Sequence, residues 1–388
     1  MLAVATRLGL TCFGGPIAHL GYFRQEYVVK RRWLDERSYA DLVGLCQFLP
    51  GATSSKVGMS VGILRAGLPG GLAAWLGFTL PSAAALTAAA ILLRGVDSHT
   101  IDLLHGLTVV AVAVVAQAVW GMARSLAPDR RRATVAVAAA GASLLLPGAV
   151  AQVAVIAAGA VVGWRVLGPG EATGESTVAI RIPRWLAVAA WSVLFGLLIG
   201  LPVARSLVGG RPLAMADSFF RSGALVFGGG HVVLPLLQSA VVSPGWIGDD
   251  QFLAGYGLAQ AVPGPLFTFA AYLGAAMRPA PNGVAGAVLA LLAIFLPSML
   301  LTLGALPLWD VLRDRPAARA AFRGVNAAVV GILLAALYNP VWTNAIRRPA
   351  DFVLALVGFG MLVVWRFPPW VVVIVSAAGG ALITTFAS

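Results

Sequence analysis

The stretch Phe13-Gly14-Gly15-Pro16, close to the start of the chain, recurs in its second half as Phe227-Gly228-Gly229-Gly230. Further pairs of residues match in the same order at an offset of about 213 to 218 residues, which chance does not maintain over rare residue types. They are Arg7 with Arg221, Trp33 with Trp246, Gln47 with Gln260, Pro50-Gly51 with Pro263-Gly264, Ser55 with Thr268, Pro81-Ser82 with Pro297-Ser298 and Gly106 with Gly324. The sequence therefore predicts two diverged copies of one structural unit.

The two copies set the domain boundaries. We expect a first repeat over residues 1–167, a linker with an unpaired transmembrane helix over 168–205, and a second repeat over 206–388. The stretch 168–178 is polar and Gly-rich, which is typical of a linker. The apolar run 185–203 has no counterpart in either copy.

The composition places the chain in a membrane. Of its 388 residues, 59% are hydrophobic and only 11% are charged, far too few charges for a soluble domain of this size. Apolar stretches such as 68–93 and 284–307 are long enough to cross a bilayer. We therefore predict an all-α, polytopic membrane protein with about 10–13 membrane segments, the count resting on the length that a membrane helix needs.

Other classes of protein are excluded by what the chain lacks. The net charge of +12 does not indicate nucleic-acid binding, because the arginines lie at the ends of apolar runs. Two cysteines without metal-type spacing predict neither a disulfide framework nor a metal site. The sequence contains no nucleophile motif and no nucleotide-binding loop, so we expect no enzyme and no cofactor.

The distribution of basic residues predicts that the second copy is inverted in the membrane. The stretch Lys30–Arg32 is basic, whereas the matching region 243–250 of the second copy has no basic residue. At the next connection the pattern reverses, with arginines in 313–319 but not over 95–100. Because basic residues favour the cytoplasmic side, inverted repeats fit this alternation, with the N-terminus in the cytoplasm and the C-terminus outside. One loop disagrees, because Arg347-Arg348 falls on the predicted outside.

The Gly/Pro-rich stretches predict broken or re-entrant helices. Adjacent Gly and Pro interrupt the helical hydrogen-bond ladder, and free backbone groups at membrane depth are tolerated only against protein or a wet cavity. Each helix that restarts after a break presents unpaired N–H groups and the positive end of its dipole. Four such N-termini, two from each copy, would form an anion site near the midplane.

Polar residues near the breaks agree with an anion. Ser54, Ser55 and Lys56 follow the Pro50-Gly51 break, and a lysine within an apolar segment is a functional candidate. The second copy has Phe269 in place of Lys56, so the site would be asymmetric. The full set of candidate substrate-binding residues is Arg7, Gly14, Gly15, His19, Gln47, Gly51, Ser54, Ser55, Lys56, Arg221, Gly228, Gly229, Gly230, His231, Gln260, Gly264 and Thr268.

Structural roles for the same residues stay open at this point. Gly and Pro in membrane helices also serve close packing and kinks, although four matched breaks weaken that interpretation. Arg7 and Arg221 also fit as snorkelling side chains, and His19 and His231 as hydrogen-bonded core residues.

These motifs resemble the signature of the chromate ion transporter family. The resemblance rests on Phe13–His19 and Gln47-x-Leu49-Pro50-Gly51 in the first copy, and on Phe227–His231 with Pro235, Gln260-x-x-Pro263-Gly264-Pro265 and Tyr272-x-Gly274 in the second. It covers nearly the whole chain and implies a long-chain, two-unit member. Two positions depart from the family pattern: Ala52 follows Pro50-Gly51 where a second Pro is usual, and Lys56 replaces an uncharged polar residue.

What the resemblance implies is a secondary transporter that exports chromate across a bacterial inner membrane and confers chromate resistance, with sulfate as a look-alike ligand. A transporter of sulfate or another anion is the alternative, and a membrane-embedded enzyme or scaffold subunit is a more distant one. From the habit of transporters we also expect a homodimer.

Overall fold

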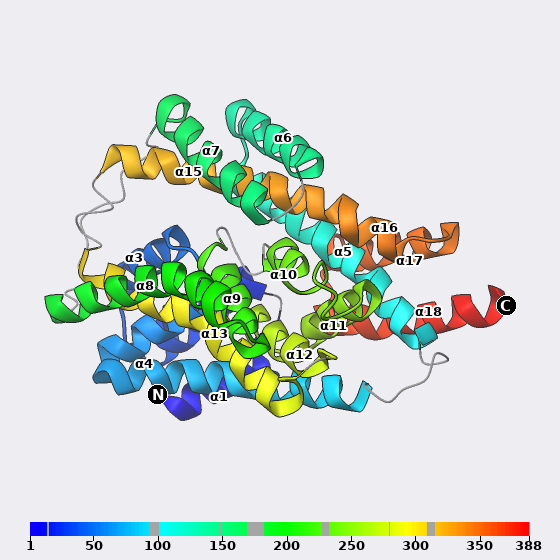
Figure 1. The fold of residues 1–388 in the computed structure, drawn as a ribbon, viewed down its shortest axis with the longest axis horizontal. Helices are drawn as coiled ribbons and strands as arrows, with labels where there is room; N and C mark the ends of the chain where they lie inside the picture. The colour runs from blue at the N-terminus through cyan, green and yellow to red at the C-terminus, as the bar shows by residue number, and fades with distance from the viewer. Residues whose placement is uncertain are drawn as a thin grey trace.

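The computed structural model describes residues 1–13, 15–93, 101–146, 149–168, 182–226, 233–278, 280–308 and 315–387 (Figure 1). Every regular element in these ranges is a helix. Five helical runs are long and apolar enough to cross a membrane, and shorter apolar helices accompany them. The expected all-α, polytopic membrane fold is confirmed.

The helices of the first half and of the second half follow one another in a similar order. The first half contains α1 (Leu2–Thr11), α2 (Gly15–Phe23) with its π-helical continuation (Arg24–Lys30), α3 (Glu36–Phe48), α4 (Thr53–Leu92), α5 (Ile101–Leu126), α6 (Arg130–Leu145) and α7 (Ala149–Val166). The expected unpaired helix is α8 (Arg184–Val208). The second half contains α9 (Arg211–Ala224), α10 (Val233–Val241), α11 (Asp249–Ala261), the 3₁₀ turn Leu266–Thr268, α12 (Phe269–Ala276), α13 (Gly283–Ala305), the 3₁₀ turn Leu306–Leu308, α15 (Pro316–Ala336), the π-helical turn Leu337–Trp342, α16 (Thr343–Ala345), α17 (Pro349–Val363) and α18 (Pro369–Ala387).

Helix α4 is a hairpin and not a straight helix of its full length. Ala66 and Gly67 have non-helical dihedral angles, with φ of +64° at Gly67. A Cβ placed on Gly62 would lie 2.3 Å from the carbonyl oxygen of Gly70, whereas eight residues of straight helix span about 12 Å. The arm that begins at Thr53 is therefore re-entrant, as the sequence predicts, and its counterparts in the second half are the separate helices α12 and α13.

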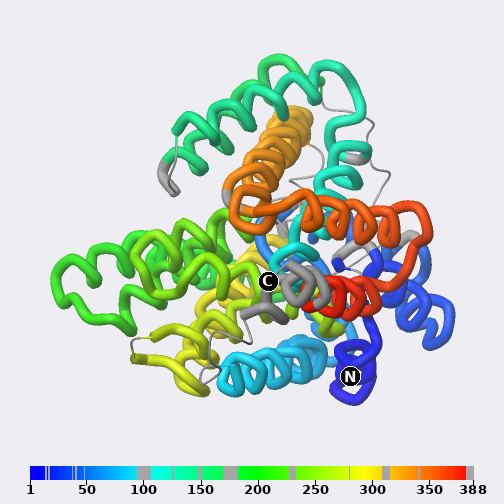
Figure 2. Tube along the Cα trace, turned by 90° about the vertical axis from the view of Figure 1, so that its right-hand side faces the viewer, coloured from blue at the N-terminus to red at the C-terminus, as the bar shows by residue number. Residues whose placement is uncertain are grey.

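The two halves exchange their last helices. Helix α15 of the second half packs against α6 and α7 of the first, and α5 of the first half packs against α17 and α18 of the second (Figures 1 and 2). The matched glycines Gly324 and Gly106 lie at these contacts between helices. A Cβ on Gly324 would lie 2.0 Å from the Gly159 oxygen of α7, and one on Gly106 would lie 2.3 Å from the Ser376 oxygen of α18. The repeats therefore interlock, with each repeat contributing helices to the packing of the other.

We expect Gly324→Ala to lower the melting temperature of the purified protein and its yield of monodisperse material. The added methyl group would collide with backbone of α7, and such overpacking costs about 1–3 kcal/mol. Gly141→Ala on α6 is the matched control, because nothing lies within 4 Å of its Cβ position. Equal melting temperatures for the two variants in scanning fluorimetry would contradict this account of the contact between α15 and α7.

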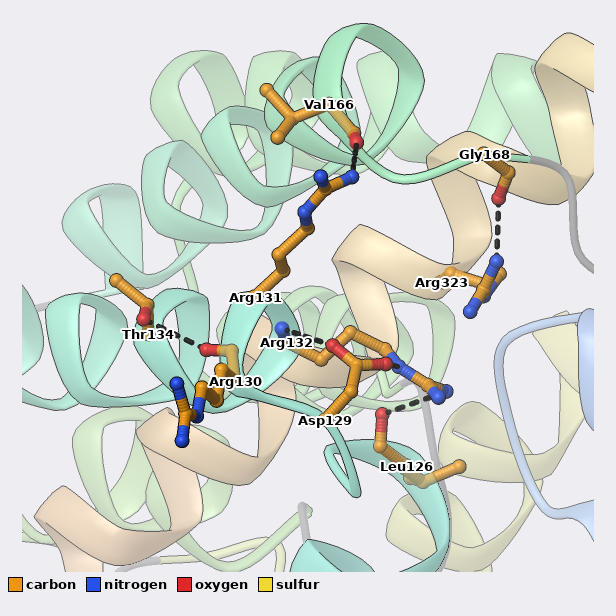
Figure 3. A network of polar contacts seen from close by, with 9 residues as sticks. All are labelled: Leu126, Asp129, Arg130, Arg131, Arg132, Thr134, Val166, Gly168 and Arg323. Atoms are coloured by element: carbon orange, nitrogen blue, oxygen red, sulfur yellow. Dashed lines mark hydrogen bonds and ion pairs between the residues drawn. The ribbon is translucent and has the colours of Figure 1, made fainter.

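Polar contacts at one end of α6, α7 and α15 reinforce the exchange (Figure 3). Asp129 caps α6, and the Arg132 backbone N–H and guanidinium hold the pKa of its carboxyl below the usual value. Arg323 on α15 donates to the Gly168 oxygen at 2.6 Å, and so bonds the second repeat to the residue that follows α7.

Candidate functional site

The two Pro-Gly breaks bond to backbone of the opposite repeat. The N–H of Gly51, in the first repeat, donates to the Val226 oxygen at 2.6 Å, directly before the Phe227 motif of the second. The N–H of Gly264, in the second repeat, donates to the Cys12 oxygen at 2.9 Å, directly before the Phe13 motif of the first. The interrupted backbone segments thus meet in two crossed contacts between the repeats, here called the Gly51 crossing and the Gly264 crossing.

A serine from the opposite repeat lies against each of these glycines. A Cβ on Gly51 would lie 2.2 Å from the Oγ of Ser298, and one on Gly264 would lie 2.7 Å from the Oγ of Ser82. Gly51 and Gly264 also have φ of +101° and +110°, a region that side chains avoid. The Pro-Ser pairs at 81–82 and 297–298, which match in the sequence, thus each place a serine against the other repeat's break.

The two serines make different hydrogen bonds. Ala52 donates its N–H to the Oγ of Ser298 at 2.9 Å. Pro265, which occupies the same place in the second repeat, has no N–H to donate. Ser82 instead donates to the Thr79 oxygen at 3.1 Å. The crossing at Gly51 therefore has an additional hydrogen bond that the crossing at Gly264 lacks.

Lys56 lies at the Gly51 break and is fully buried. Its Nζ donates to the Leu49 oxygen at 2.5 Å and to the Pro50 oxygen at 2.9 Å. These carbonyls follow the end of α3 at Phe48, where the negative end of the helix dipole lies. The ammonium group thus satisfies the interrupted backbone and brings a positive charge to the crossing.

The second repeat fills the position of Lys56 with an aromatic cluster. The Phe269 ring packs on those of Phe252, Tyr256 and Tyr272, at centroid distances of 5.2, 5.8 and 6.2 Å. Among the described residues, Lys56 at the first repeat's break thus has an aromatic and uncharged counterpart in the second repeat.

The remaining predicted residues fall into three groups. Ser54, Ser55 and Thr268 are buried after the breaks, Gly15 begins α2, and His19 is buried with its ring edge-on to Phe78. Arg7 and Gln47 are exposed, Gln260 is half-buried, and Arg221 pairs with Asp217 on the same helix, α9. Outside the described residues lie Gly14, Gly228, Gly229, Gly230 and His231.

Buried hydroxyl groups near the breaks lack partners. The Oγ of Ser55 and the Oγ1 of Thr79 are both buried and have no hydrogen-bond partner among the described residues. An unsatisfied buried polar group costs about 1–3 kcal/mol, so such donors indicate a ligand or water. The sequence reasoning missed Thr79, although a threonine beside the repeat-matched Pro81-Ser82 was a usable signal.

A pocket of about 590 Å³ leads from the protein surface to the break region. It includes Phe13, next to the Cys12–Gly264 contact, and Gln260 at the end of α11. Gln117 and Arg124 line it from one face of α5, and Arg366 lines it from the turn between α17 and α18. The sequence reasoning assigned no role to these three residues, because the exchanged helices that bring them together are far apart in the chain.

Discontinuous helices that meet between two repeats of a polytopic fold are typical of membrane transport proteins. A sequence profile for the chromate transporter matches residues 1–164 and 213–381. The chain belongs to the chromate transporter family, and it is a transporter and not an enzyme.

Relatives with known names support this assignment. A chromate transport protein of Pseudomonas aeruginosa is 27% identical over 96% of this chain and 89% of its own length. A chromate transport protein of Cupriavidus metallidurans is 25% identical over 93% of this chain and 86% of its own. A shorter protein of Bacillus subtilis, the uncharacterized transporter YwrB, is 33% identical over 43% of this chain and 85% of its own length. No solved structure matches the chain.

Proposed function

We propose that the protein is a secondary transporter that exports chromate, a tetrahedral oxyanion, from the cytoplasm across a bacterial inner membrane, and that it thereby confers chromate resistance. The observation that carries the proposal is the crossed pairing of Gly51 with Val226 and of Gly264 with Cys12. The names of the full-length relatives support chromate as the substrate.

The chemistry around the breaks suits an oxyanion. The N-terminus of α4 follows the Gly51 break, and helix N-termini bind tetrahedral anions through their N–H groups and dipole. Lys56 adds a positive charge, and Ser55 and Thr79 add hydroxyl groups that the described residues leave unbonded. Because these groups are buried, their attraction for an anion is stronger than it would be in water.

The direction of transport follows from the charge of the substrate. A dianion that leaves a cell with a negative interior gains about 4.6 kcal/mol per 100 mV, twice the value for a single charge. Export therefore needs no coupled ion. In the proposed orientation, with a cytoplasmic N-terminus and an external C-terminus, Arg124 and Arg366 lie on the cytoplasmic side, so the pocket they line would collect substrate from the cytoplasm.

Flux of radiolabelled chromate in proteoliposomes that contain only this protein tests the proposal. We expect chromate to move toward the positive side of an imposed membrane potential, and the rate to rise with the potential. A folded protein without chromate flux at any potential would refute the proposal. Sulfate, a tetrahedral dianion of the same charge, serves as the competitor and tests the alternative substrate, since faster flux of sulfate than of chromate would favour it.

We expect Arg124→Gln with Arg366→Gln to raise the KM for chromate by roughly three- to tenfold, with a smaller change in the maximal rate. Arginines at the mouth of a pocket raise the local concentration of an anion, and salt screens this effect. The KM of the wild type should therefore rise with ionic strength more steeply than that of the variant. Arg347→Gln is the control, because its surface pair with Asp250 lies elsewhere. An unchanged KM in the double variant would exclude this pocket as the access route.

A further inference from the structure

A second pocket, of about 500 Å³, lies between α7, α8, α9, α10 and the turn that follows α10. Its polar lining includes two guanidinium groups and four hydroxyl groups, from Arg205, Arg221, Ser218, Ser222, Ser239 and Ser243. A water molecule occupies about 30 Å³, so the pocket has room for a tetrahedral oxyanion with part of its hydration shell. Of these residues, the sequence singled out Arg221 alone.

The two arginines share one buried carboxylate. Asp217 is 0% exposed, and its Oδ2 accepts from Arg221 at 2.6 Å and from Arg205 at 3.3 Å. Its Oδ1 is buried and has no hydrogen-bond partner among the described residues. Each guanidinium has five N–H donors, of which these contacts use one. Two guanidinium groups and one carboxylate give the cluster a net charge of about +1. One carboxylate oxygen and most of the guanidinium N–H groups are not used in these contacts.

The repeat does not account for this arrangement. Arg221 corresponds to Arg7, but Ala3 stands where Asp217 would be, one helical turn earlier. Arg205 comes from α8, which has no counterpart in the first repeat. The carboxylate and the second arginine are therefore additions to one side of the transporter.

We propose that this pocket is a second oxyanion-binding site, in which the Asp217 carboxylate occupies Arg205 and Arg221 until a substrate anion competes for them. The inference rests on the proposed function, because it takes the ligand to be the transported oxyanion. A carboxylate presents the same charged oxygens to a guanidinium as an oxyanion does. An arriving dianion brings more charge and more acceptor oxygens to the two arginines than Asp217 alone, and its departure lets the carboxylate return.

The pocket lies next to the backbone contact between Gly51 and Val226, because both adjoin the end of α9. Leu225 lines it, and the following residue, Val226, accepts the hydrogen bond from Gly51. In the proposed orientation the pocket faces the external side. The pocket would receive the oxyanion after the oxyanion has passed the two breaks, and Asp217 would then help to release the oxyanion.

A fluorescent label at the rim of the pocket tests the proposal. Ser243 is exposed, and both native cysteines, Cys12 and Cys46, are buried, so Ser243→Cys can be labelled selectively in the full-length protein. Sodium chromate is titrated at constant ionic strength, and sodium sulfate in a parallel series. We expect saturable quenching by chromate, and Asp217→Asn should lower the Kd roughly tenfold by removing the competing charge.

Two further variants complete the experiment. Arg205→Gln with Arg221→Gln should abolish the saturable response. Glu26→Gln is the matched control, because Glu26 is also a buried carboxylate beside two basic side chains, at 2.7 Å from Arg31 and 3.7 Å from Lys30, but in the first repeat. It should leave the Kd unchanged.

The outcomes separate this inference from the proposed function. If Asp217→Asn lowers the melting temperature but leaves the chromate Kd at the wild-type value, the carboxylate only holds α8 to α9, and the inference is wrong. If the label does not respond to chromate while proteoliposomes transport it, the second site does not exist but the transport function stands. If neither chromate nor sulfate gives flux or a response, both proposals fail.

Discussion

Gly51→Ala and Gly264→Ala should each abolish chromate flux and destabilise the folded protein by about 2 to 6 kcal/mol. Both glycines have a φ that only glycine adopts easily, and forcing an alanine into it costs about 1–3 kcal/mol. The methyl group would also collide with the Oγ of Ser298 or of Ser82, which adds a similar cost. The larger effect is on transport, because the collision forces apart the backbone pairs that join the repeats.

A control and a rescue identify the cause of that loss. Gly196→Ala on α8 adds a methyl group where nothing lies within 4 Å, so it should leave flux and melting temperature unchanged. Adding Ser298→Gly to Gly51→Ala removes the colliding hydroxymethyl group and should restore part of the stability. Normal flux in Gly51→Ala, measured per folded molecule, would show that the Gly51 crossing is not needed for transport.

Lys56→Met should reduce chromate flux by about a hundredfold, which corresponds to about 2.7 kcal/mol of lost attraction. Methionine retains most of the length and apolar character of the lysine but removes the only positive charge that the described contacts place at the Gly51 break. The melting temperature should change much less. Removing the buried charge stabilises the folded protein, because the charge no longer has to be kept out of water. The loss of a charged donor to the Leu49 and Pro50 oxygens destabilises it, so the two effects oppose each other.

The chain supplies a matched control for this variant, because Lys30 is its other lysine. Lys30 is exposed and lies 3.7 Å from Glu26, so Lys30→Met should transport chromate at the wild-type rate. If Lys56→Met also transports at that rate, Lys56 has a structural role at the break and does not contribute to substrate binding.

Much of the fold could be predicted because its determinants are local. Gly and Pro interrupt a helix wherever they stand, so the breaks at Pro50-Gly51 and Pro263-Gly264 were visible in the sequence. The apolar run predicted over 68–93 also begins where the chain reverses at Ala66 and Gly67. The exchange of α5 and α15 between the repeats could not be predicted. A glycine in a membrane helix indicates a close contact with another helix, but it does not identify that helix.

The candidate site was predictable in part for the same reason. Lys56 stood out as a buried charge, and its contact with Leu49 and Pro50 agrees with the rule that helical side chains point back toward the N-terminus. The support of Gly51 by Ser298 depends on tertiary packing and on Ala52 having an N–H, and no spacing in the sequence encodes it. Asp217 was missed although it stands four residues before Arg221, a spacing at which side chains of a helix meet, and only its second partner, Arg205, lies on a helix outside the repeat.

The position of bound chromium tests the central claim most directly, namely that the crossed breaks form the transport site. Anomalous scattering at the chromium edge would locate it in crystals equilibrated with chromate at the concentration that gives half-maximal flux. The account predicts a peak beside the Gly51–Val226 or the Gly264–Cys12 contact, and sulfate should displace it. A structure in which chromium occupies only sites away from both contacts, while the same protein transports chromate, would contradict the account.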